Sequence, residues 1–178
     1  MNWSEGIQRP MRWVQPRKLK MNYELVRGND VIATLRFKSS WGSLATLENA
    51  DGCWTLKRSV GWQTRVTVRT CGSEADIATF KCNSWKGGGT LELPGGRRIL
   101  ATTNMWQTQL EFHEESGECL VRLKYDSFWC TSAALDVSPA GQTAPETSWI
   151  TALGWYVMVM MQMDAVSCAA VVTVPVVT

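Results

Sequence analysis

His113 is the only histidine in the chain, so any chemistry that needs an imidazole would have to use this residue. Glu111, Glu114 and Glu115 lie beside it in the sequence, and a neighbouring carboxylate raises the basicity of an imidazole. His113 nevertheless occupies an outward position in an alternating segment, where side chains are normally solvated. The single histidine excludes sites with two or more imidazoles. We therefore expect a protein that is not an enzyme, with no catalytic residue, metal ligand or cofactor.

The six cysteines, at positions 53, 71, 82, 119, 130 and 168, contain no C-x-x-C pair. This spacing does not support a zinc ribbon or a thioredoxin-like redox motif. The segment from Met1 to Gln15 lacks the apolar core of a signal peptide. We therefore expect reduced thiols in a cytoplasmic protein, one that could also lie at the periphery of a membrane.

Basic side chains on the outward faces of the expected strands are the best candidates for a binding site. Lys and Arg attract anionic membranes by about 1 kcal/mol each near the surface. The alternative is an ordinary solvated β surface. The candidate lipid-binding residues are Arg36, Lys38, Lys57, Arg58, Arg65, Arg69, Arg97 and Arg98. The net charge, 18 − 16 = +2, is too small to indicate nucleic-acid binding.

Alternation of polar and apolar residues predicts the elements that carry these side chains. Val66 and Val68, for example, alternate with Arg65, Thr67 and Arg69, which is the pattern of a strand with one buried face. Similar segments separated by turn residues recur about every 8–12 residues, which is typical of an antiparallel sandwich or barrel. We expect a mainly β protein: a closed antiparallel barrel of about 10–12 strands.

The segment Trp149–Met163 is apolar on nearly every side, and such a helix lies either inside protein or in lipid. A membrane span would need to continue through Asp164, a costly carboxylate in lipid. All 18 bases and 12 of the 16 acids precede residue 125, so the helix lacks basic flanks. We expect it to fill the barrel, with these residues in the core: Trp149, Leu153, Trp155, Tyr156 and Met160.

These patterns predict one domain over residues 1–178. An N-terminal arm covers 1–17, strands cover 18–126, and a linker rich in small residues and Pro covers 127–148. The core helix covers 149–164 and an extended tail covers 165–178. Tryptophans recur near strand ends, and large rings there would seal the barrel around its helix. We expect this structural role for most of the tryptophans Trp41, Trp54, Trp62, Trp85 and Trp106.

Several segments give the chain a family resemblance. Leu91-Glu92-Leu93-Pro94-Gly95-Gly96-Arg97 is similar to the strand-then-glycine turns of LURP-one-related proteins, and Leu153-Gly154-Trp155-Tyr156 is similar to the start of their core helix. Trp41 and Trp106 resemble their recurrent tryptophans. The chain thus resembles the tubby-like superfamily, which also includes tubby C-terminal domains and phospholipid scramblases. The resemblance implies a barrel that encloses a hydrophobic C-terminal helix. It transfers no functional residue.

The expected function is that of a binding module, with anionic phospholipid or phosphoinositide headgroups, or a protein partner, as its ligand. No nucleic-acid partner is expected. One alternative is a tail-anchored membrane protein with a soluble β domain. Another is a scaffold or protein-interaction domain that takes no small ligand. The sequence specifies neither the ligand nor the oligomeric state.

Overall fold

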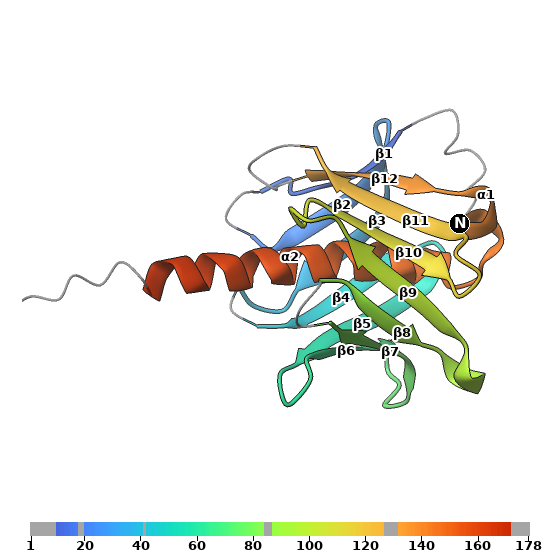
Figure 1. The fold of residues 1–178 in the computed structure, drawn as a ribbon. Coiled ribbons are helices and arrows are strands. Elements are labelled where there is room, and N and C mark those ends of the chain that lie inside the picture. Colours follow the sequence, from blue (N-terminus) through green and yellow to red (C-terminus); the bar gives the residue numbers. More distant parts are fainter. Residues whose placement is uncertain (1–9, 18–19, 41, 84–86, 127–131, 172–178) are drawn as a thin grey trace, which may run out of the picture.

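The structure, a computed structural model, describes residues 10–17, 20–40, 42–83, 87–126 and 132–171, with side chains described up to Ala165. Its strands form one closed antiparallel barrel in which each strand pairs with the next and β12 pairs with β1 (Figure 1). The strands are β1 (Met11–Val14), β2 (Asn22–Arg27), β3 (Asp30–Phe37), β4 (Leu44–Asn49), β5 (Gly52–Ser59), β6 (Arg65–Thr70), β7 (Asp76–Cys82), β8 (Gly89–Glu92), β9 (Arg98–Thr103), β10 (Gln109–Glu114), β11 (Cys119–Tyr125) and β12 (Ser132–Val137). The helices are α1 (Pro139–Thr143), α2 (Thr147–Val171) and a short 3₁₀ turn, η2 (Pro94–Gly96).

The alternation of each strand sets which side chains enter the barrel. In β6, Val66 and Val68 are buried, whereas Arg65 is exposed and Arg69 is half-buried on the outer face. Trp54 and Leu56 of β5 are buried in the same way. This inward and outward arrangement is the one that the sequence pattern predicts, because successive side chains of a strand point to opposite faces. The mainly β, closed-barrel fold is therefore confirmed.

Helix α2 runs through the middle of the barrel and leaves at one end (Figure 1). Its residues from Trp149 to Met160 are buried and belong to the core. The Trp155 ring lies 5.4 Å from the Tyr23 ring of β2 and 5.8 Å from the Tyr125 ring of β11, between ring centroids. Because strands surround the helix, its apolar side chains find partners on every side. Within the described part of the chain, no helix has the length and apolar character required to cross a bilayer.

Hydrogen bonds fix the direction of α2. At its start, Asn49 Nδ2 donates to the carbonyl oxygen of Ser148 over 2.8 Å. Farther along, the Tyr156 hydroxyl donates to the carbonyl of Ser43 and accepts from the backbone N–H of Arg58. Burial raises the pKa of Tyr156 to about 12, so this hydroxyl stays protonated at neutral pH. We call the end where α2 leaves the barrel the exit end, and the opposite end, beside α1, the α1 end.

Two segments predicted to lack regular structure contain strands of the barrel. The predicted linker 127–148 contains β12 and α1, and the predicted arm 1–17 contains β1. β1 pairs with both β2 and β12, so the pairing of β1 with β12 closes the barrel. The inward residues of β12 include the small Ala133, whose size suits a position close to the central helix. Small residues and nearby prolines gave this region the composition of a loop.

The helix boundaries also differ from the prediction of 149–164. α2 begins at Thr147, whose hydroxyl donates to the carbonyl of Gly141, and it continues to Val171. Asp164 does not end the helix; its Oδ2 lies 2.7 Å from Arg58 Nη1, which offsets its charge. The predicted extended tail, 165–178, is therefore wrong up to residue 171. Residues 172–178 lie outside the described part of the chain.

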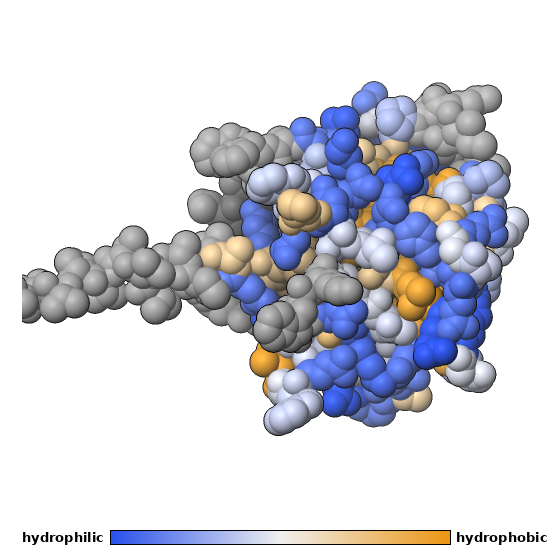
Figure 2. Space-filling view, viewed as in Figure 1, coloured by the Kyte–Doolittle hydropathy of each residue, from blue (hydrophilic) through white to orange (hydrophobic). Residues whose placement is uncertain are grey.

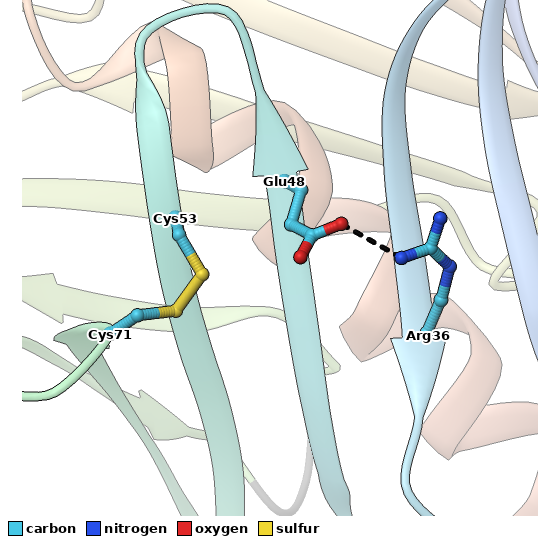
Figure 3. The surroundings of a disulfide bond; sticks show 4 residues. All are labelled: Arg36, Glu48, Cys53 and Cys71. Atoms are coloured by element: carbon cyan, nitrogen blue, oxygen red, sulfur yellow. Dashed lines mark hydrogen bonds and ion pairs between the residues drawn. A yellow bond between two sulfur atoms is a disulfide. The ribbon is translucent and has the colours of Figure 1, made fainter.

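A disulfide joins Cys53 of β5 to Cys71, the residue after β6 (Figure 3). Their Cα atoms are 5.4 Å apart because the hairpin register brings the two positions opposite each other. The prediction of reduced thiols is wrong for this pair. Cys82 and Cys119 are free thiols, and burial raises the pKa of both. Cys130 and the side chain of Cys168 lie outside what the structure describes.

Gly154 provides a test of how closely α2 fits the barrel. A Cβ atom at this position would lie 2.6 Å from Leu123 Cδ1 and 3.0 Å from Phe112 Cε2. We expect Gly154→Val to lower the free energy of unfolding by about 2 kcal/mol, since overpacking of a core costs about 1–3 kcal/mol. Urea denaturation followed by circular dichroism measures this. The control is Ala165→Val, at an exposed position of the same helix, where we expect a change within about 0.5 kcal/mol.

Candidate functional site

Five of the eight candidate lipid-binding residues take part in ion pairs. Arg36 lies 2.8 Å from Glu48 (Figure 3), and Arg58 lies 2.7 Å from Asp164. The other three contact acids near the α1 end: Arg69 with Asp76 and Glu74, Arg97 with Glu114 and Glu146, and Arg98 with Glu115. Local acids thus offset these five positive charges, so the eight residues do not act as one basic patch.

The remaining three, Lys38, Lys57 and Arg65, have no ion-pair partner among the described residues, and all three are exposed. Lys57 lies near the end of β5, Arg65 at the start of β6, and Lys38 directly after β3. Odd-numbered strands end at the exit end, because neighbouring strands run antiparallel and Arg58 of β5 meets α2 there. The unpaired candidates therefore gather at the exit end, whereas Arg69, Arg97 and Arg98 lie toward the α1 end.

The same end carries most of the exposed apolar side chains. Six large hydrophobic residues are exposed in the described part of the chain, and four of them occupy two connections at the exit end. Val60 and Trp62 lie between β5 and β6; Val60 is 75% exposed and Trp62 fully exposed. Met105 and Trp106 lie between β9 and β10 and are 88% and 80% exposed. Folding leaves these side chains in water although two of them are tryptophans, which indicates a role outside the core.

The two ends of the barrel also differ in charge. Among described residues, the exit-end connections hold the bases Arg17, Lys20 and Lys38 and one acid, Asp126. Asp126 lies 3.6 Å from Arg12, which offsets its charge. The connections at the α1 end hold a single base, Arg97, and the acids Asp51, Glu74, Glu115, Glu118 and Glu146. The described connections therefore carry net positive charge at the exit end and net negative charge at the α1 end.

We define the exit face by its exposed apolar and basic side chains: Lys20, Lys38, Lys57, Val60, Trp62, Arg65, Met105 and Trp106. Figure 2 shows that the surface in this view is mainly hydrophilic, with apolar surface along the part of α2 that leaves the barrel. The helix thus emerges through the exit face.

A pocket of about 460 Å³ opens where α2 leaves the barrel. Val157, Met160 and Met161 of the helix form part of its apolar lining. The Arg58–Asp164 ion pair contributes polar lining to the same pocket. The pocket therefore places apolar helix side chains next to a charged pair at the exit end.

The predicted structural role of the tryptophans holds for only part of the set. Trp54 is buried, as expected, whereas the exposure of Trp62 and Trp106 shows that the expectation is wrong for these two. Trp41 and Trp85 lie outside the described residues. A sequence signal for the exposed pair existed: tryptophans occur at 41, 62, 85, 106 and 129, at intervals of 21 or 23 residues. That interval is about the number of residues from one exit-end connection to the next, that is, two strands and the connections that join them.

The five helix residues assigned to the core, Trp149, Leu153, Trp155, Tyr156 and Met160, are all buried inside the barrel.

No protein-family model, curated protein or solved structure matches this chain. Its function is therefore inferred from its own residues and their geometry.

Proposed function

We propose that this protein is a non-enzymatic module that docks on anionic phospholipid membranes through its exit face. The observation that carries the proposal is the exposure of Trp62 and Trp106, which lie in the β5–β6 and β9–β10 connections at the end of the barrel where α2 leaves. Tryptophan favours the interface between lipid headgroups and acyl chains, because its ring is apolar and its N–H is polar. Val60 and Met105 add exposed apolar side chains to the same two connections.

Charge supports the same orientation. Lys38, Lys57 and Arg65 lie on the β3–β6 side of the exit end, on either side of the connection that holds Val60 and Trp62, without ion-pair partners in the described part of the chain. Basic side chains beside exposed apolar side chains let the apolar groups enter the interface while the bases contact phosphates and carboxylates of the headgroups. The acidic α1 end then faces away from the membrane, since a negative surface repels it.

We further propose that the chain belongs to the tubby-like superfamily. The support is architectural: a closed antiparallel barrel that surrounds an apolar C-terminal helix. The resemblance of Leu153-Gly154-Trp155-Tyr156 to the core helix of LURP-one-related proteins fits this architecture, because Trp155 and Tyr156 are fully buried in the barrel.

Vesicle sedimentation tests the proposal. The full chain is mixed with vesicles of phosphatidylcholine alone or of phosphatidylcholine with phosphatidylserine, at low and high salt. We expect binding to the phosphatidylserine vesicles to be the stronger, and to weaken as salt screens the surface charge. Equal binding to both vesicle types, or no binding at low salt, would contradict the proposal. Self-association without vesicle binding would instead assign the exit face to a second copy of the chain.

Lys38→Glu and Arg98→Glu form a matched pair for the orientation. Each substitution changes the net charge by the same amount, but Lys38 lies at the exit end and Arg98 toward the α1 end. At about 1 kcal/mol per charge near the membrane, Lys38→Glu removes one attraction and adds one repulsion. We expect its Kd for phosphatidylserine vesicles to rise about 30-fold, and that of Arg98→Glu to change less than about threefold. Equal effects of the two variants would show that the whole barrel, rather than one face, responds to the lipid.

A further inference from the structure

A second group of side chains lies on the outer wall of the barrel, away from the exit face. Glu111 and His113 of β10 and Cys119 of β11 place a carboxylate oxygen, a ring nitrogen and a sulfur within 4.8 Å of one another. All three residues are half-buried. They meet because β10 and β11 are paired and the register shifts between Phe112 and His113, which brings His113 opposite Cys119. Such irregularities in a strand re-aim individual side chains.

The chemical types of these three groups are the ones that bind zinc. Thiolate, imidazole and carboxylate are its usual protein ligands, at about 2.0–2.3 Å from the metal. A tetrahedral site with those bond lengths separates its ligand atoms by about 3.3–3.8 Å. The three atoms therefore need to move little to surround one ion. With three protein ligands, a fourth position remains for water.

The hydrogen bonds of Glu111 suit a metal ligand. Its Oε1 accepts from Arg122 Nε and, over 2.8 Å, from Gln109 Nε2. Its Oε2 accepts a hydrogen bond from His113 Nε2 over 3.0 Å. Partners on one carboxylate oxygen orient the group and leave the other oxygen directed into the cluster, which is the usual arrangement around bound metals. Although partial burial acts to raise it, the pKa of Glu111 is lowered by Arg122 and His113, so the carboxylate is ionised at neutral pH.

We propose that Glu111, His113 and Cys119 form a binding site for one divalent ion of the zinc class. When the ion binds, the Cys119 thiol releases its proton to solvent and a sulfur–metal bond forms, while His113 gives up its hydrogen bond to Glu111 and binds through the ring nitrogen that carries no proton. No electron is transferred in this step. The thiolate and the carboxylate supply two negative charges, which balance the ion, and Arg122 stays on the outer oxygen of Glu111. The proposal is independent of membrane docking, since β10 and β11 place these residues on the barrel wall.

Cobalt titration of the full chain tests this site. Co²⁺ binds in place of zinc, and a cobalt–thiolate bond produces a charge-transfer absorption that reports sulfur coordination directly. We expect a saturable band at one equivalent, displaced by Zn²⁺. Cys119→Ser should abolish the band, and His113→Ala should weaken cobalt binding at least tenfold. The control is Cys82→Ser, because Cys82 is also a half-buried free thiol but lies on β7, outside the cluster.

The variants also separate the site from other thiols of the chain. The three ligands lie on the outer face of the barrel, so circular dichroism should show an unchanged fold for each variant. The proposal is overturned if the wild-type protein gives no saturable sulfur band. It is overturned equally if the band survives in Cys119→Ser, or if Cys82→Ser removes it.

Discussion

Trp155→Ala is expected to lower the free energy of unfolding by about 3–5 kcal/mol, the range for removing a large buried aromatic side chain. Trp155 is fully buried, and its ring contacts the rings of Tyr23 and Tyr125 from two different strands. Truncation to alanine therefore opens a cavity at the centre of the barrel, where the strands cannot collapse without breaking their pairing. Urea denaturation followed by far-ultraviolet circular dichroism gives the value.

Trp155→Phe is the matched control. It keeps an aromatic ring in the same place and removes the Trp155 indole N–H, which has no hydrogen-bond partner among the described residues. Because an unsatisfied buried donor is itself unfavourable, its removal offsets part of the lost packing. We expect a loss of about 1 kcal/mol. If Trp155→Ala cost less than this, α2 would not be the core of the barrel, and the tail-anchor alternative would gain support.

Trp62→Ala combined with Trp106→Ala is expected to weaken binding to phosphatidylserine vesicles about 100-fold. A tryptophan ring carries about 200 Å² of surface. If about a third of it leaves water at the interface, each ring contributes about 1.5 kcal/mol at roughly 25 cal/mol per Å². Two rings then contribute about 3 kcal/mol, which is roughly 100-fold in Kd. Stability should change little, because both side chains are exposed in the folded chain.

The matched control is Val31→Ala combined with Leu100→Ala. These are the other two exposed large hydrophobic residues of the described chain, and they lie on strands β3 and β9 rather than in the exit-end connections. We expect this variant to bind vesicles as the wild-type protein does. If the two double variants lost binding equally, exposed apolar surface in general would drive adsorption, and the exit face would have no special part in it.

The sequence is sufficient to predict the local parts of this fold. Val66 and Val68 of β6 alternate clearly with charged residues, so periodicity alone identifies their buried face. The apolar helix is equally clear, and the lack of nearby bases correctly favours the barrel interior over lipid. Its end is less predictable: the helix continues past Asp164 to Val171, and the partner of Asp164, Arg58, lies 106 positions away in the sequence.

Closure of the barrel is a long-range property that local patterns do not reveal. β1 contains only four residues and lies between Pro10 and Pro16, so it is too short to show a clear alternation of polar and apolar residues. The Cys53–Cys71 disulfide can be predicted only when the register of the β5–β6 hairpin is known, because that register places the two residues opposite each other. The register depends on the position of the turn, so an error of one residue in the expected end of a strand changes which residues lie opposite each other.

The residues of the exit face could not be predicted from the sequence for a different reason. Basic side chains such as Arg69 and Arg97 look similar in sequence to Lys38, but the fold gives them acidic partners and leaves Lys38 without one in the described chain. Likewise, Trp54 and Trp62 both lie near strand ends, and only the three-dimensional structure shows that one is buried and the other exposed. Composition therefore identifies the candidate residue types, while topology decides which of them share a face.

Hydrogen–deuterium exchange of the full chain, with and without phosphatidylserine vesicles, tests the central claim most directly. It reports which backbone segments the membrane covers and requires no substitution. The exit-face account predicts slower exchange in the connections 60–64 and 104–108, and unchanged exchange in 71–75 and 93–97 at the α1 end. Protection at the α1 end instead, or vesicle binding without protection of the exit-end connections, would contradict it.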